Sequence, residues 1–150
     1  MSLQINLHEA PLPSHQHSEE EIRFENWLNN NPKIDEWFYS AIVGVSFPND
    51  DGTSRQKYLR HCKPYEPLVL KWCKDNPVDK LAVGVFRETG EQLGHLNSRC
   101  AHETLNKTKR GEKWTALLVN VGSPAGNPFL LGALIVMARK KEKVASRSLN

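Results

Sequence analysis

Apolar residues recur along this chain in short runs, and the spacing within each run predicts its secondary structure. Runs rich in β-branched residues, or alternating between apolar and polar, are typical of strands. Six segments have this character and are predicted strands: Ala41–Phe47, Leu68–Cys73, Leu81–Glu88, Gln92–Leu96, Trp114–Val121 and Phe129–Ala138. Most are joined by short turns rich in Gly, Pro, Asn and Asp, which favours an antiparallel arrangement.

Three other segments carry helical signals. Ser18, followed by Glu20 and Glu21, predicts a helix N-terminus, since a hydroxyl caps free amides and acids favour the positive helix end. A short helix is predicted from Ser54 through Cys62. Another is predicted to be capped by Ser98 and to end at Gly111, a residue that tolerates the left-handed conformation.

The predicted order is β, α, β, β, β, α, β, β, after the N-terminal helix. Two small helices inserted into a mainly antiparallel set fit a barrel better than a parallel α/β sheet. We therefore predict a mainly β protein with an OB-like, partly open β-barrel of about six strands and two short helices, preceded by an N-terminal helical extension.

The start and the end of the chain are predicted to lie outside the barrel. Residues 1 to about 18 have little that could pack, and they are predicted to be disordered. After the first helix, a short second turn is predicted to carry Trp37 and Phe38. The predicted organisation is an acidic tail and helical extension over 1–40, the barrel over 41–139 and a basic tail over 140–150.

Charge is distributed unevenly. The whole chain carries a net charge of +3, but up to Asp51 two basic residues stand against nine acidic ones. That segment has a net charge of −7, so the remainder carries about +10. A basic body suits a phosphate backbone, and an acidic arm either shields it or binds another partner. The alternative is that both are simply solvated faces.

The remaining composition predicts no metal, no cofactor and no membrane segment. Cys62, Cys73 and Cys100 make an odd count without a C-x-x-C pair, which favours reduced thiols. Structural zinc sites usually draw ligands in close pairs, which the cysteines and histidines here do not form. The longest apolar stretch is about half of the roughly 20 residues that span a membrane. A cytoplasmic location is expected, since the N-terminus has no secretion signal.

Catalytic motifs are missing from the sequence as well. It contains no phosphate-binding P-loop, no nucleophile elbow and no H-E-x-x-H pair. The segment Gly122–Gly126 only loosely resembles a glycine-rich loop, and Pro124 removes an amide that a phosphate cradle needs. We therefore predict that the protein is not an enzyme.

Several short motifs follow one another between Val43 and Met137. They are Val43–Phe47, Arg55 with Leu59, Pro67–Leu70, Asp75-Asn76-Pro77-x-Asp79 with Ala82-Val83, and Gly90-x-Gln92-Leu-Gly94-His-Leu96. Each motif is weak alone. Their order and spacing over about two-thirds of the chain resemble a HIRAN domain, a module found beside helicase and nuclease domains and also alone in bacteria and phages.

The resemblance implies an OB-like barrel that holds the 3′ end of single-stranded DNA in a pocket beside the first strand. Carried over by position, Phe47 is an aromatic wall on which a base stacks. Asp79, in the turn with Asn76, accepts a hydrogen bond from the terminal hydroxyl or the base. Stacking is worth ~1–3 kcal/mol per base, so one aromatic residue matters.

Two positions depart from the DNA-binding members of that family. Ser46 stands where they have Arg, and Val78 stands where they have Tyr. These changes remove a phosphate clamp and a stacking face. We expect looser binding with little sequence preference, in which other cations contact the phosphates. Those cations are Arg55, Lys57, Arg60 and Arg99.

Each binding residue also has a structural interpretation. Asn76 and Asp79 are residue types that cap turns for local reasons alone. Phe47, at the end of a predicted strand, is equally expected to belong to the core.

The predicted function is a non-catalytic nucleic-acid-binding module that binds single-stranded DNA or a DNA 3′ end in DNA repair or processing. The alternative is a protein-interaction module on a HIRAN-like scaffold, as in a phage or defence protein. In that case the acidic N-terminal arm, with Trp27, Trp37 and Phe38, docks on a protein partner or imitates the charge of nucleic acid.

Overall fold

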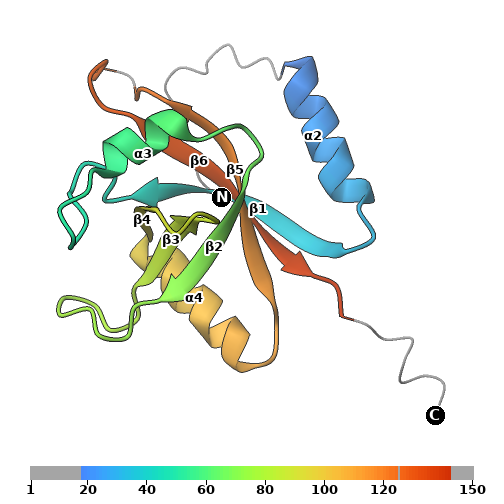
Figure 1. Ribbon diagram of the computed structural model, residues 1–150. Coiled ribbons are helices and arrows are strands. Elements are labelled where there is room, and N and C mark those ends of the chain that lie inside the picture. The colour runs from blue at the N-terminus through green and yellow to red at the C-terminus, as the bar shows by residue number, and fades with distance from the viewer. Residues whose placement is uncertain (1–17, 125, 143–150) are drawn as a thin grey trace.

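Three helices and six strands make up the part of the chain described by a computed structural model, residues 18–124 and 126–142 (Figure 1). In chain order they are α2 (Glu19–Asn30), β1 (Ile34–Val43), α3 (Arg55–His61), β2 (Pro67–Trp72), β3 (Val83–Arg87), β4 (Gln92–Leu96), α4 (Ser98–Lys109), β5 (Trp114–Gly122) and β6 (Gly132–Lys140). The predicted tail over residues 1–17 and the last part of the basic tail, from 143 on, lie outside the described residues.

The six strands form a barrel in the order β1-β4-β3-β2-β5-β6. Every neighbouring pair is antiparallel, so the predicted mainly β, OB-like fold is confirmed. The ring of pairings is closed, where the sequence pattern suggested a partly open one. β1 closes it, because its N-terminal part pairs along β6 from Ile34 with Lys140 to Ala41 with Leu134, while its last residues pair with β4.

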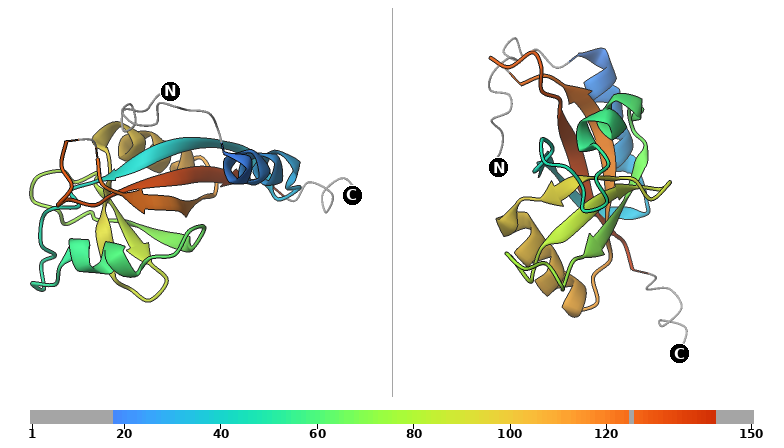
Figure 2. Two further views of the ribbon diagram at one scale, coloured as in Figure 1. Left: turned by 90° about the horizontal axis from the view of Figure 1, so that it is seen from above. Right: turned by 60° about the vertical axis from the view of Figure 1, so that its left-hand side comes forward.

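The main core fills the barrel and extends under two helices. Side chains from all six strands meet inside it: Ile42, Leu68, Val83, Val85, Leu93, Leu118, Ile135 and Met137. α3 adds Leu59, and α4 adds Cys100, Ala101 and Leu105. Figure 2 shows α3 and α4 against different parts of the strand wall. Burying such side chains is the main stabilising contribution to the fold.

A second, smaller core attaches α2 to the outside of the barrel. Phe24 and Leu28 are one helical turn apart and both are buried against side chains of β5 and β6. The helix begins as predicted, because Ser18 and Glu21 form a reciprocal capping box. α2 is therefore a packed part of the fold.

The prediction that Trp37 and Phe38 lie in a helical turn is wrong, since both lie in β1. β1 begins at Ile34, so the barrel includes residues that the boundary at residue 40 assigned to the extension. Phe38 points into the main core, whereas Trp37 and Tyr39 contact the second core under α2. Because both faces of this strand are covered, both are apolar, and the polar alternation of a half-exposed strand is missing.

Two smaller differences involve strand and helix ends. Asn97, not Ser98, caps α4, and its side-chain oxygen accepts a hydrogen bond of 2.9 Å from the Cys100 N–H. β6 begins at Gly132, so Phe129 lies in the preceding loop and not in a strand.

Candidate nucleic-acid interface

Two loops adjoin at one end of the barrel, the β1–α3 loop (residues 44–54) and the β5–β6 loop (described residues 123–124 and 126–131). Gln56 of α3 joins them. Its side-chain amide donates to the carbonyl oxygens of Val45 and Leu131, at 3.0 and 2.9 Å. The Leu131 N–H donates back to Gln56 Oε1 at 2.8 Å. The half-buried Gln56 side chain thus donates two hydrogen bonds and accepts one, and these bonds hold both loops together.

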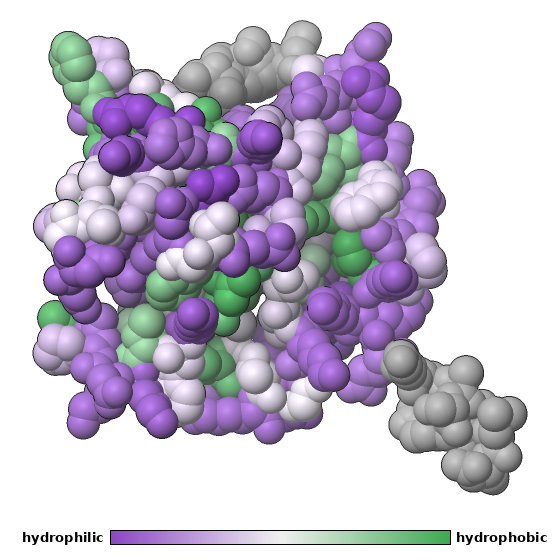
Figure 3. All heavy atoms as spheres, in the orientation of Figure 1, coloured by the Kyte–Doolittle hydropathy of each residue, from purple (hydrophilic) through white to green (hydrophobic). Residues whose placement is uncertain are grey.

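Each of these loops exposes a phenylalanine. Phe47 is 66% exposed and Phe129 is 91% exposed. In Figure 3, hydrophobic residues project at the upper left, where Figure 1 draws the β5–β6 loop. Phe47 is therefore not the core residue that one interpretation expected. Phe129 was missed, although the turn residues Asn127 and Pro128 just before it indicate a loop. We call these two loops, with Phe47 and Phe129, the aromatic pole.

Arg55 supports the aromatic pole from inside. It is only 7% exposed, so it lacks the surface position that its predicted phosphate contact requires. Its guanidinium donates to Asn49 Oδ1 at 2.6 Å and to the Gly44 carbonyl oxygen at 2.8 Å. Burial lowers the pKa of Arg55. Arg55 was expected at the surface because charged residues usually lie there. Here one side-chain acceptor and one backbone acceptor compensate its burial.

Asn49 extends this support to the sheet. Its side chain is buried, and its amide donates to the Thr53 hydroxyl and to the carbonyl oxygen of Gln92, both at 3.1 Å. His95, on the same strand as Gln92, has a pKa below its usual value because of burial and the nearby Arg55 charge. The β1–α3 loop is thus tied to β4 by a network of buried polar groups.

The other predicted cations lie on the surface. Lys57 and Arg60 of α3 are exposed, and neither forms an ion pair with the described residues. Arg99 of α4 is also exposed and lies 3.6 Å from the Glu103 carboxylate, one turn along the helix. Ser46 is exposed beside Phe47. Lys57, Arg60 and Arg99 keep the accessibility that a phosphate contact requires.

Asn76 and Asp79 stabilise the β2–β3 loop. Asn76 Oδ1 accepts hydrogen bonds from the N–H groups of Val78 and Asp79, at 2.9 and 3.0 Å. Asp79 accepts from the Leu81 N–H and lies 3.2 Å from His102 Nε2; both contacts lower the pKa of Asp79. Both residues therefore have the turn-capping role. No hydrogen bond or ion pair between described residues joins this loop to Phe47, and a binding role for Asn76 and Asp79 stays a prediction.

Comparisons with known proteins bear on the fold and leave the binding residues untested. No family model matches the sequence, and no curated protein is similar to it. Among solved structures, the HIRAN domain of human HLTF is similar, with a TM-score of 0.54 over 78% of this chain and 85% of that one, at 16% identity. The fold of this chain is HIRAN-like. A protein from Lactobacillus plantarum is also similar, with a TM-score of 0.51 and 13% identity over 71% of this chain and 100% of that one.

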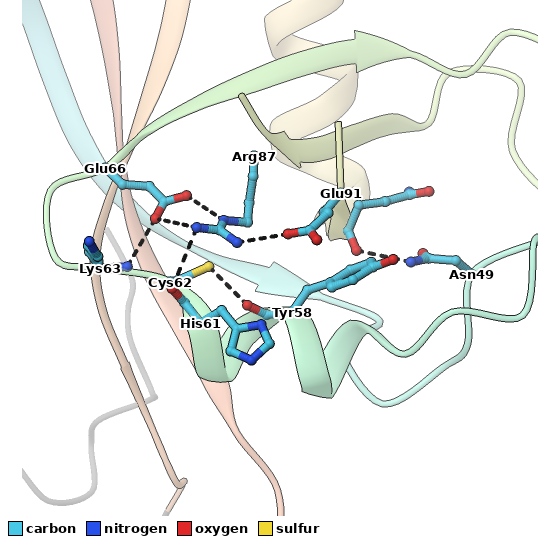
Figure 4. Close-up of polar contacts among 9 residues, drawn as sticks. Asn49, Tyr58, His61, Cys62, Lys63, Glu66, Arg87 and Glu91 are labelled. Carbon is cyan, nitrogen blue, oxygen red and sulfur yellow. Dashed lines mark hydrogen bonds and ion pairs between the residues drawn. The ribbon is translucent and has the colours of Figure 1, made fainter. Parts of the chain in front are cut away.

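A cluster of polar side chains fastens α3 to the β3–β4 hairpin of the HIRAN-like barrel (Figure 4). The Arg87 guanidinium lies 2.7 Å from Glu66 and 2.7 Å from Glu91. Cys62 lies beside this cluster, and burial raises its pKa to about 11. Because the thiolate is the nucleophile, a thiol with such a pKa is poorly suited to catalysis at neutral pH. The cluster therefore has a structural role, because Arg87 links the end of α3 to the β3–β4 hairpin.

Within residues 18–124 and 126–142, no three His, Cys, Asp or Glu side chains gather closely enough to hold a metal ion. No helix in the same ranges is long and apolar enough to cross a membrane.

Two hollows of the surface lie beside α2, away from the aromatic pole. One is lined by Phe24, Trp27, Tyr65 and Leu117, and the other runs along the helix from Arg23 to Pro32. Trp27 contributes to both and is 52% exposed. These hollows do not include Phe47 or Asp79, so they differ from the end-binding pocket that the resemblance implied.

Proposed function

We propose that this protein is a non-catalytic module that binds single-stranded DNA at the aromatic pole. The observation that supports this proposal most directly is the pair of exposed phenylalanines, Phe47 and Phe129, on loops that Gln56 holds together. Unpaired bases offer flat faces to such side chains, and each stacked base is worth ~1–3 kcal/mol. The HIRAN-like fold supports this proposal, because that module binds nucleic acid.

Cations next to the aromatic pole complete the proposed interface. Lys57 and Arg60 project from α3, the helix whose Gln56 holds the two loops. Since no ion pair with a described residue occupies them, they are available to phosphates. Binding through such contacts has little sequence preference and weakens as salt rises, because condensed counterions are released from the strand.

We further propose that the module recognises a 3′ end and serves DNA repair or processing in the cytoplasm. Asp79 is the candidate acceptor for a terminal hydroxyl. It already has two partners, but a carboxylate offers about four acceptor positions and retains capacity for a third. Asn76 supports Asp79 by fixing the turn, and Val78, which is 93% exposed, supplies an apolar contact where other members have an aromatic one.

Fluorescence anisotropy with a short labelled DNA strand tests both levels of this proposal. The same strand is offered with a 3′ hydroxyl, with a 3′ phosphate and as a closed single-stranded circle. Stronger binding of the 3′ hydroxyl form supports end recognition. Equal binding of all three refutes end recognition and supports general single-strand binding. Absence of binding at low salt refutes the proposed function altogether.

The second candidate is protein docking through α2. The observation that favours it is Trp27, half-exposed between two hollows on a helix whose first turn is acidic. Deletion of the helix is a poor test, because Phe24 and Leu28 belong to the second core. The substitution Trp27→Ala is better: partner capture that is lost while DNA binding persists would favour docking as the function.

A further inference from the structure

Lysines from four separate parts of the chain converge at the end of the barrel opposite the aromatic pole. They are Lys33, Lys107, Lys113, Lys140 and Lys141, which we call the basic pole. β1, β5 and β6 each run from one pole to the other. Lys33 precedes β1 and Phe47 follows it, and ten strand residues at about 3.3 Å each put the poles roughly 30 Å apart.

Backbone hydrogen bonds hold these segments together. The Lys140 N–H donates to the Lys113 carbonyl oxygen at 2.8 Å, and the Lys141 N–H donates to that of Lys33 at 2.9 Å. The Lys107 ammonium lies 4.9 Å from the ring centre of Trp114, which follows Lys113. Figure 1 draws the end of α4 at the bottom and the end of β6 to its right, and Figure 3 shows mostly hydrophilic residues over that region.

The acidic groups around the basic pole are mostly occupied by other partners. Arg139 lies 2.8 Å from Asp35 and 3.0 Å from Glu36. Glu112 accepts a hydrogen bond from the Trp114 indole and lies 3.6 Å from Arg110. Glu142 follows Lys141 on the exposed chain. Within the described part of the chain the five lysines form no ion pair, although Lys107 interacts electrostatically with Glu112. With Arg110 and Arg139 they outnumber the acidic residues Asp35, Glu36, Glu112 and Glu142, so this pole is positively charged.

The chemistry of the basic pole differs from that of the aromatic pole. The ring next to Lys113 is not open to a base, because Lys107 covers Trp114 on one side and Phe38 packs against Trp114 within the core. An unpaired base therefore cannot stack on Trp114, and the half-exposed ring of Trp27 lies on α2, beside the hollow that ends at Pro32. Lysine ammonium groups on flexible stems instead suit the regularly spaced phosphates of a double helix.

We propose that the basic pole binds the phosphate backbone of duplex DNA. This is a second binding surface, and it does not depend on the aromatic pole. A molecule with both surfaces contacts a single-stranded end and, about 30 Å away, the neighbouring double strand. It is therefore suited to the junction between the two. Contacts of this kind depend on charge and not on base sequence.

The test uses a relaxed, covalently closed circle of duplex DNA, which has no end for the aromatic pole to capture. Filter binding of the full chain is measured over a range of salt concentrations. The variant Lys113→Gln/Lys140→Gln/Lys141→Gln should bind the circle at least tenfold more weakly at low salt. Its slope of log affinity against log salt should fall by about 2.7, that is about 0.9 for each lost phosphate contact.

The matched control is Lys63→Gln/Lys74→Gln/Lys80→Gln, which removes the same charge from exposed lysines elsewhere. It should keep most of the affinity for the circle, and both variants should retain the wild-type melting temperature. Equal weakening in both variants, or unchanged binding by the first, would overturn the proposal. So would binding of anionic phosphatidylserine vesicles without binding of the circle. If the wild-type chain binds the duplex circle but does not bind single-stranded DNA, only the function proposed for the aromatic pole is refuted.

Discussion

The Arg55 guanidinium donates a hydrogen bond of 2.8 Å to the Gly44 carbonyl oxygen, across the start of the loop that exposes Phe47. Gly44 has a φ of +73°, and a Cβ there would lie 3.2 Å from Arg55 Nη1. The position therefore requires glycine for two reasons, its backbone conformation and the close approach of the guanidinium. A buried cation and a glycine together set the direction of the proposed stacking residue.

Replacing Arg55 with Met should lower the free energy of unfolding by about 2–3 kcal/mol, because Asn49 and Gly44 lose a charged donor in a buried place. Urea unfolding followed by circular dichroism measures this change. Lys57→Met on the exposed side of the same helix is the control, with an expected change within about 0.5 kcal/mol. Equal stability of the two variants would contradict the supporting role of Arg55.

Replacing Phe47 or Phe129 with Ala should weaken single-strand binding by about 5- to 100-fold each, the equivalent of one lost stacked base. Since both side chains are exposed, the free energy of unfolding should change by less than about 0.5 kcal/mol. Anisotropy titrations and urea unfolding measure the two effects. Ile22→Ala, which removes an exposed apolar group from α2, should leave binding unchanged. Binding that survives both Phe substitutions would remove the basis of the aromatic pole.

Glu66 predicts a pH dependence of stability. Burial raises its pKa, but hydrogen bonds from Arg87 and from the Lys63 N–H outweigh burial and hold the pKa below its ordinary value of 4.5. A depressed pKa in the folded state stabilises the protein above pH 4.5, and this contribution is lost as the pH falls through the folded-state pKa.

The variant Glu66→Gln lacks this titration. It should be less stable than the wild type at neutral pH by about 1–3 kcal/mol, and the difference should shrink as acid protonates Glu66 in the wild type. Urea unfolding over a pH series measures the difference. Glu88→Gln, at an exposed position without an ion pair to the described residues, should show no such convergence. A constant difference at every pH would argue against the Arg87–Glu66 contact.

His95 should titrate with a midpoint below 6.5, because burial and then the Arg55 charge lower its pKa, while Asp50 only partly offsets them. As the pH falls below 6.5 the unfolded chain takes up a proton that the folded chain does not, so folding stability decreases there. NMR of the imidazole Cε1–H signal, assigned with His95→Gln, measures the midpoint. In Arg55→Met the midpoint should rise. An unchanged midpoint would separate His95 from the Arg55 network.

Local patterns were enough to predict much of the architecture. The Ser18 capping box, the Gly111 helix end and the alternating β2 strand are signals that depend on near neighbours in the chain. Antiparallel order followed from the short connections, and the HIRAN-like motifs indicated the same barrel. Of the predicted interface, the accessibility of Phe47, Lys57, Arg60 and Arg99 agrees with the structure, whereas that of Arg55 does not.

What the sequence determined by itself was thus the type and order of most elements, since these depend on side-chain period and on turn residues. The tertiary structure alone decided which face of an element is covered. α2 packs over Trp37 and Tyr39 and so covers the outer face of β1, and the β1–α3 loop folds over Arg55 and gives it buried acceptors. It also brought five lysines from distant segments to one pole. Burial and convergence depend on contacts between remote residues, and no local pattern records them.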